Sequence, residues 1–208
     1  MIKNIIFDLG GVILNIDYNL TIEAFKELGI PFFEQMFSKF QQDRVADNFE
    51  KGLISENDFR NHIRQAAGIN YDDEMIDRAW NAMLLDFPPR RIEMLRQLKA
   101  DGYNLFLLSN TNSIHQRALQ HNFEVQFGTA FDTLFTRAYY SHDTGMRKPE
   151  KEIFGKVLAD FELQPNETLY IEDSKQHTDV AQTLGIRCVL MQTNGDTPAI
   201  VFDHLALR

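Results

Sequence analysis

The stretch that decides the fold is Lys3-Asn4-Ile5-Ile6-Phe7-Asp8-Leu9-Gly10-Gly11-Val12. Ile5, Ile6 and Phe7 form an unbroken apolar run, which is typical of a strand buried on both faces of a parallel sheet. Asp8 follows this run at once. In α/β proteins, ligands bind in the crevice beyond the carboxyl ends of the strands. Asp8 is therefore either a ligand-facing carboxylate or the cap of a turn or helix, and this stretch alone leaves both interpretations open.

Three later apolar runs have the same character, and we predict strands at 103–108, 168–171 and 187–191. Patterns with helical spacing accompany them at 90–100, 150–161 and 176–184. Strands that alternate with helices over short connections form parallel sheets with helices on both faces. The sequence therefore predicts an α/β fold built on a doubly wound parallel sheet.

The segment 17–86 breaks this rhythm. It contains no convincing strand, and its apolar spacing predicts helices at 20–28, 33–40, 56–66 and 73–84. A crossover between parallel strands usually needs about a dozen residues, so this segment is far too long for an ordinary connection. We predict a core domain made of 1–16 and 87–208, and an all-helical cap domain, 17–86, inserted after the first strand.

Composition limits the partners and the location. The chain has 208 residues and a formal net charge of −9, which argues against nucleic acid or an anionic membrane as a partner. No apolar stretch approaches the ~18 residues of a membrane span. Asp8 and the glycines interrupt the N-terminal apolar run, so we expect no signal peptide. The single cysteine, Cys188, cannot form an internal disulfide, and a reducing cytoplasm fits best. Monomer and homodimer are equally compatible with the sequence.

Polar residues follow two of the later strands. Ser109-Asn110-Thr111-Asn112 follows the second predicted strand, where a hydroxyl and free backbone N–H groups before a helix can bind an anion. The same residue types are also ordinary helix caps. Glu172-Asp173-Ser174 follows the third predicted strand. Adjacent buried acids are costly unless paired or bound to a cation, and with Asp8 they offer oxygen ligands suited to Mg²⁺. Helix capping by Asp173 or Ser174 is the alternative.

A basic pair, Arg147-Lys148, precedes Pro149. Proline is favoured at a helix start, so we expect Lys148 just before a helix, where its charge could neutralise a phosphate. A solvated surface lysine is the alternative, and Arg147 is an alternative cation. The joint order of acid, hydroxyl, lysine and paired acids along the chain is more specific than any one of these signals.

With the acid, the hydroxyl, the lysine and the paired acids in this order, the chain resembles the haloacid dehalogenase-like hydrolase superfamily over essentially its whole length. The matching segments are Phe7-Asp8-Leu9-Gly10-Gly11-Val12, Leu108-Ser109-Asn110-Thr111-Asn112, Gly145-Met146-Arg147-Lys148-Pro149 and Ile171-Glu172-Asp173-Ser174. The helical insert resembles the smaller type of cap in this superfamily. The motifs at 109–112 and 145–149 look closest to those of a bacterial subgroup that contains an α-D-glucose-1-phosphate phosphatase.

The resemblance implies a Rossmann-like core and a Mg²⁺-dependent phosphatase of a small phosphorylated metabolite, with a sugar phosphate as one candidate. It implies that Asp8 is the nucleophile and forms an aspartyl-phosphate. Ser109 would bind the transferring phosphoryl group with help from the Asn110 backbone, and Lys148 would offset negative charge. The implied metal ligands are Asp8, the Gly10 carbonyl, Asp173, and Glu172 either directly or through water.

One position departs from the family pattern. Most phosphatases of the family carry a second Asp two residues after the nucleophile as general acid and base, and Gly10 stands there in this chain. Such help is typically worth ~10²–10⁴ in rate. A bound water, Asp17 or Asp47 are candidate replacements. The departure keeps open a catalytically weak protein that binds phosphorylated ligands. It also keeps open a 2-haloacid dehalogenase, although the paired acids count against that activity.

The cap is expected to choose the substrate. The segment 49–55 reads as a helix-turn-helix joint that can reach the site, and Arg44 and Lys51 are candidate contacts for a polar end of the substrate. His177 follows the last motif, and we expect a structural role for it because Mg²⁺ prefers oxygen ligands.

Overall fold

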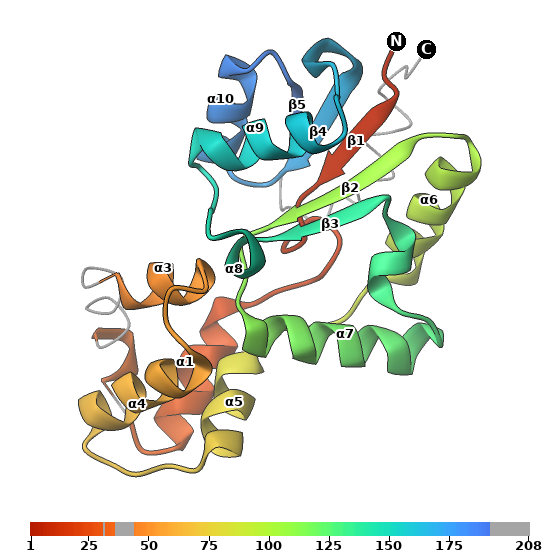
Figure 1. Ribbon diagram of the computed structural model, residues 1–208. Helices are drawn as coiled ribbons and strands as arrows, with labels where there is room; N and C mark the ends of the chain where they lie inside the picture. Colours follow the sequence, from red (N-terminus) through yellow and green to blue (C-terminus); the bar gives the residue numbers. More distant parts are fainter. Residues whose placement is uncertain (31, 36–43, 192–208) are drawn as a thin grey trace.

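The computed structural model describes residues 1–30, 32–35 and 44–191. They form a five-stranded sheet in which every neighbouring pair is parallel, in the order β3-β2-β1-β4-β5. The strands are β1 (Asn4–Phe7), β2 (Asn104–Ser109), β3 (Arg137–Tyr140), β4 (Thr168–Glu172) and β5 (Arg187–Leu190). The predicted doubly wound α/β fold is confirmed, and β1 lies at the centre of the sheet (Figure 1).

The sequence patterns missed β3. This strand has only four residues, Arg-Ala-Tyr-Tyr, and it pairs with β2 alone at the edge of the sheet. Arg137 is exposed, whereas Tyr139 and Tyr140 are buried. An edge strand need not be apolar along its length, so it lacks the continuous hydrophobic run that marks the buried strands.

Helices cover both faces of the sheet. The core helices are α6 (Pro89–Ala100), α7 (Ser113–Phe127), α8 (Ser141–Thr144), α9 (Lys151–Asp160) and α10 (Lys175–Thr183), with 3₁₀ turns at Phe131–Leu134 and Pro165–Glu167. Ile5 and Phe7 belong to the hydrophobic cluster that contains side chains of α6 and α7. Ile6, which points the other way, belongs to the cluster with α9 and α10. The alternation along one buried strand thus supplies both halves of the core.

The described part of 17–86 contains helices and no β-strand. They are α1 (Tyr18–Glu27), α3 (Val45–Glu50), α4 (Glu56–Ala67) and α5 (Asp73–Asn81). Residues 33–35 are also helical, and the rest of the helix predicted at 33–40 lies outside the described residues. These helices share a hydrophobic cluster that includes Phe25, Phe59 and Trp80, and Ile114 of the core helix α7 also belongs to it. The helical insert after the first strand is confirmed, while the boundaries of the two domains stay a proposal.

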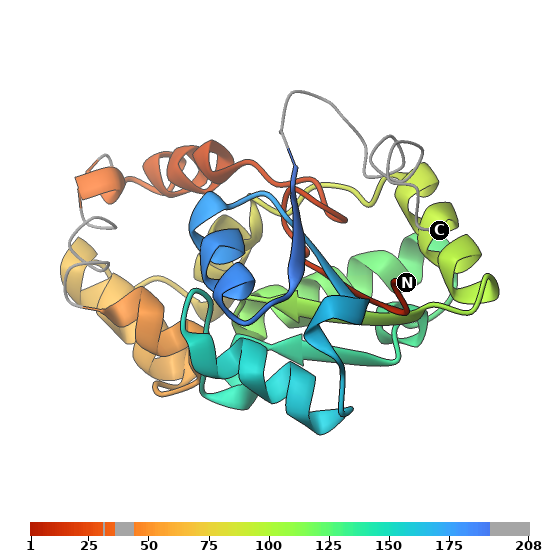
Figure 2. The same cartoon turned by 90° about the horizontal axis from the view of Figure 1, so that it is seen from above.

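The cap lies at the carboxyl end of the sheet. Figures 1 and 2 place the red and orange cap helices together at one end of the molecule, beyond the ends of β1 and β2. None of the helices in the described ranges is both long and apolar enough to cross a membrane. Because the cap lies at the carboxyl end of the sheet, we expect the polar residues that follow the strands to meet in the space between cap and sheet.

Candidate active site

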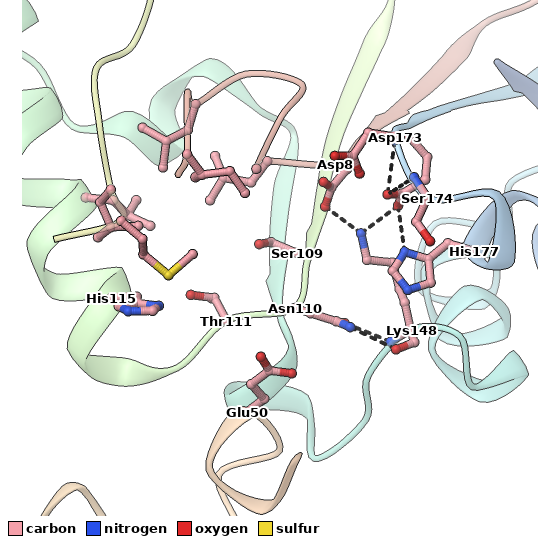
Figure 3. Close-up of a pocket in the computed structure, with 18 of the residues that line it drawn as sticks. Asp8, Glu50, Ser109, Asn110, Thr111, His115, Lys148, Asp173, Ser174 and His177 are labelled. Carbon is pink, nitrogen blue, oxygen red and sulfur yellow. Dashed lines mark hydrogen bonds and ion pairs between the residues drawn. The ribbon is translucent and has the colours of Figure 1, made fainter. Parts of the chain in front are cut away.

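A pocket of about 410 Å³ lies between the carboxyl ends of the strands and the cap. Asp8, Ser109 and Lys148 line it, together with Glu172 and Asp173. The structure therefore brings together the polar residues that the sequence placed at the ends of different strands, and Figure 3 shows Asp8, Lys148 and Asp173 side by side. The cap contributes a second set of lining residues, which are described below.

Lys148 is the buried cation of the pocket. Its side chain is 1% exposed, and its Nζ lies 2.5 Å from Asp8 Oδ1 and 2.8 Å from Glu172 Oε2. A buried ammonium is tolerated only when it is paired, and here it has two carboxylate partners. Helix α9 begins at Lys151 rather than at Pro149, so Lys148 lies in the preceding loop. The surface-lysine alternative is wrong for this residue.

Asn110 fixes the backbone of Lys148. Its side-chain Nδ2 donates to the Lys148 carbonyl, and its Oδ1 accepts from the Lys148 N–H, both at 2.8 Å. Ser109, at the end of β2, is 3% exposed and lines the same pocket. Asn112 caps α7 by accepting from the His115 N–H, so the capping role belongs to Asn112. Ser109 is left facing the pocket.

Glu172 holds Lys148 in place. Its Oε2 accepts hydrogen bonds from Lys148 and Tyr170, and its Oε1 accepts from the backbone N–H groups of Asp173 and Ser174. Burial acts to raise the pKa of Glu172, but the charge of Lys148 and the hydrogen bonds to the carboxylate lower it well below its usual range. Glu172 is therefore ionised near neutral pH. His177 Nδ1 lies 3.2 Å from Glu172 Oε2, which gives this histidine a supporting position behind the acid.

Asp8, Glu172 and Asp173 can face one cation together. Each offers an oxygen within 4.8 Å of the others. Burial raises the pKa of Asp8 to about 6 despite the opposing charge of Lys148. Burial, the hydrogen bond with Glu172 and the charge of Asp8 raise the pKa of Asp173 to about 7. Crowded carboxylates that resist ionisation are stabilised by a divalent cation, and an all-oxygen set fits Mg²⁺.

Two glycines after Asp8 shape the pocket in different ways. A Cβ on Gly11 would clash with Asp173 Oδ2, and Gly11 has a φ of +74°, so glycine is required for this close approach. A Cβ on Gly10 would lie 2.9 Å from Ile16 Cδ1. The nearest atom to the place where a second acid would project is thus the flexible end of the apolar Ile16 side chain. Gly10 and Asp8 both line the pocket, and the Gly10 carbonyl as a metal ligand stays a prediction.

The predicted cap residues lie elsewhere. Asp17 caps α1 by accepting from the Asn19 N–H, Asp47 pairs with Arg147, and Lys51 pairs with Glu150. Neither these three nor Arg44 line the pocket. The cap residues that do so are Tyr18, Glu50, Met83 and Leu84. Sequence reasoning missed them because helix spacing does not show which polar residue at a helix end faces another domain.

The comparisons with known proteins agree with this geometry. Residues 5–191 match the family model described as haloacid dehalogenase-like hydrolase. The chain is 29% identical to a D-ribitol-5-phosphate phosphatase of Bacteroides thetaiotaomicron, over 94% of this chain and 95% of that protein.

Two solved structures are also similar. A haloacid dehalogenase family enzyme of Bacteroides thetaiotaomicron, in complex with magnesium and inorganic phosphate, superposes with a TM-score of 0.90 at 38% identity, covering 96% of this chain and 99% of that one. A predicted hydrolase of this type from Porphyromonas gingivalis gives 0.86 at 30% identity, covering 99% and 98%. The chain therefore belongs to the haloacid dehalogenase-like hydrolase family of enzymes.

Proposed function

We propose that this enzyme is a Mg²⁺-dependent phosphatase of a small phosphorylated metabolite, with sugar and polyol phosphates as the leading candidates. The observation that carries the proposal is the buried Lys148, held between Asp8 and Glu172 at 2.5 and 2.8 Å. This arrangement places a positive charge beside a nucleophilic carboxylate. Phosphoryl transfer depends on such positioning and charge neutralisation more than on further covalent chemistry.

The reaction takes two steps on Asp8. One carboxylate oxygen of Asp8, which is mainly ionised near neutral pH, forms a bond to phosphorus. The bond from phosphorus to the leaving oxygen breaks, and that oxygen keeps the electron pair and takes a proton from water. A second water then attacks phosphorus and loses a proton to solvent, while the bond from phosphorus to Asp8 breaks. Inorganic phosphate leaves, and the carboxylate is restored.

The neighbouring groups have supporting roles in this proposal. Lys148 offsets the negative charge of Asp8 and of the phosphoryl oxygens, and Ser109 and the Asn110 backbone bind those oxygens. Asp8, the Gly10 carbonyl and Asp173 would hold the metal, with Glu172 direct or through water. When bound, Mg²⁺ supplies positive charge that neutralises the phosphate. The hydrogen bonds accepted by both Glu172 oxygens favour the water-mediated arrangement.

The relatives support the class of substrate. The ribitol-5-phosphate phosphatase acts on a small polyol phosphate, and the similar solved structure holds magnesium and phosphate. A cytoplasmic location stays a prediction that rests on the sequence.

One observation favours a second candidate function, the binding of phosphorylated ligands with little turnover. Gly10 offers no general acid, and the side chain nearest to the place where one would project is the apolar Ile16. Leaving groups that depart easily, such as anomeric sugar phosphates or acyl phosphates, would suffer least from this loss.

Phosphate release tests the proposal. Purified protein is assayed with sugar phosphates, polyol phosphates and acyl phosphates, with Mg²⁺ or with EDTA. We expect Mg²⁺-dependent turnover that falls by more than about 10³-fold in Asp8→Asn, because the amide is a poor nucleophile. Asp179→Asn, which removes an exposed acid paired with Lys175 on α10, should keep wild-type activity. Turnover retained in Asp8→Asn would contradict the proposal. Tight binding by calorimetry without turnover would favour the second candidate.

A further inference from the structure

Glu50 brings a negative charge from the cap to the pocket. It is the last residue of α3 and lines the same pocket as Asp8. Figure 3 shows its carboxylate directed from the cap toward Thr111 and Asn110. Glu50 Oε2 is buried and lies 2.8 Å from Arg147 Nη2, but it has no hydrogen-bond partner among the described residues. The Glu50 carboxylate can therefore still accept a hydrogen bond from a molecule in the pocket.

Arg147 does not provide a free cation on this side. Its Nη1 lies 2.5 Å from Asp47 Oδ1, and its Nη2 contacts Glu50. Two carboxylates share one guanidinium, so the group of Asp47, Glu50 and Arg147 carries a formal charge of −1. Both Nη atoms of Arg147 are thus paired with acidic side chains of the cap.

The charges around the pocket lead to the same conclusion. Its lining contains four acidic side chains, those of Asp8, Glu50, Glu172 and Asp173, against the two cations Arg147 and Lys148. The formal difference is −2, which one divalent cation would cancel. His115 adds no positive charge near neutral pH, because burial lowers its pKa to about 4. With one divalent metal, the formal charge of the lining is zero. The cations that remain for the phosphoryl group are then Lys148 and the metal, because Arg147 is paired with Asp47 and Glu50.

We propose that Glu50 is a specificity-determining residue that restricts the enzyme to monophosphates whose leaving group is neutral and hydroxylated. This inference rests on the proposed function and narrows its substrate class. A hydroxyl group can donate to an oxygen of the Glu50 carboxylate, and hydrogen bonds to charged groups are stronger than those between neutral groups. A carboxylate or second phosphate has no proton to donate and is repelled by the same oxygen.

A matched pair of substrates tests the inference. Ribitol 5-phosphate and 5-phosphoribonate differ only in a neutral hydroxymethyl group or a carboxylate at the end far from the phosphate. With saturating Mg²⁺, we expect wild-type kcat/KM to favour ribitol 5-phosphate by at least about tenfold. Glu50→Gln keeps the size and an acceptor oxygen but removes the charge. It should reduce this preference by about fivefold or more, mainly by lowering KM for 5-phosphoribonate.

Asp47→Asn is the matched control. It removes the same formal charge from the group with Arg147 but leaves the Glu50 carboxylate in the pocket, so the preference should fall by less than it does in Glu50→Gln. Calorimetric binding of the two ligands to Asp8→Asn with Mg²⁺ gives the preference without turnover. Equal effects of Glu50→Gln on both ligands, or a wild-type preference for 5-phosphoribonate, would overturn the inference. Failure to hydrolyse any phosphate defeats the proposed function instead, and the binding preference still decides the role of Glu50.

Discussion

Gly10 stands two residues after Asp8, and a side chain added there would first meet Ile16. The family's usual acid is absent at position 10, and Ile16 lies against the space it would enter. Gly10 and Ile16 both line the pocket beside Asp8, the proposed nucleophile. A substrate whose leaving oxygen needs little protonation would lose least from the missing acid, whereas a polyol phosphate would need water to supply the proton.

Restoring the acid should therefore require two substitutions. Gly10→Asp alone puts a carboxylate against Ile16, so we expect no gain in kcat with poor leaving groups. In Gly10→Asp/Ile16→Ala the new carboxylate has room, and kcat should exceed that of the single variant by about tenfold or more. Steady-state kinetics with a simple alkyl phosphate measure the difference, and Ile16→Ala is the control. A gain in Gly10→Asp that Ile16→Ala does not increase would show that Ile16 is no obstacle.

Single residues also show how far the sequence could predict the site. Asp8, Ser109 and Lys148 were identifiable because each follows a strand or precedes a helix at an edge where the fold gathers polar groups. Glu50 and Tyr18 were not, because their relevance depends on how the cap docks. Asn110 was expected to act through its backbone, and its side-chain contacts to the Lys148 backbone came only from the structure.

At the scale of elements, the turn between α3 and α4 sets how closely the cap approaches the core. Gly52 in this turn has a φ of +65°, and a Cβ there would clash with the carbonyl oxygen of His142 in α8. Glu50 stands two residues before this contact. The sequence predicted the joint at 49–55, but helix patterns carry no information on which core element it meets. The edge strand β3, which leads into α8, was missed for lack of an apolar run.

Gly52→Ala should therefore disturb the cap and the site together. Gly68 ends α4 with a similar φ of +69° and has no atom within 4 Å of its added Cβ, so Gly68→Ala is the matched control. We expect Gly68→Ala to lower the free energy of unfolding by about 1 kcal/mol without changing kcat/KM. Gly52→Ala should cost at least about 1 kcal/mol more and lower kcat/KM by about tenfold. Urea unfolding and steady-state kinetics measure both effects, and equal behaviour of the two variants would contradict this account.

In the whole molecule, the core carries the proposed catalytic residues and the cap carries Glu50, the proposed specificity residue. Contacts from several elements join the two parts. Trp80 of α5 stacks on His115 of α7 with ring centroids 5.0 Å apart, and Arg117 of α7 makes two hydrogen bonds to Glu56 of α4, at 3.0 and 2.9 Å. Exposed ion pairs contribute little individually, so the buried aromatic contact and the Gly52 turn matter more for the seating of the cap. The fold class and the order of the motifs were predictable because short stretches of sequence determine them. The position of the cap on the core was not, because it depends on contacts between residues far apart in the chain.

The central claim is that Asp8 carries the phosphoryl group during turnover. Rapid quenching during turnover, reduction with borohydride and peptide mass spectrometry test it, because an aspartyl-phosphate is reduced to homoserine whereas a free carboxylate is not. We expect homoserine at position 8 in the wild-type enzyme with Mg²⁺ and substrate, and unmodified Glu172 and Asp173 in the same digest. Reduction at Glu172 or Asp173 with Asp8 unchanged would contradict it.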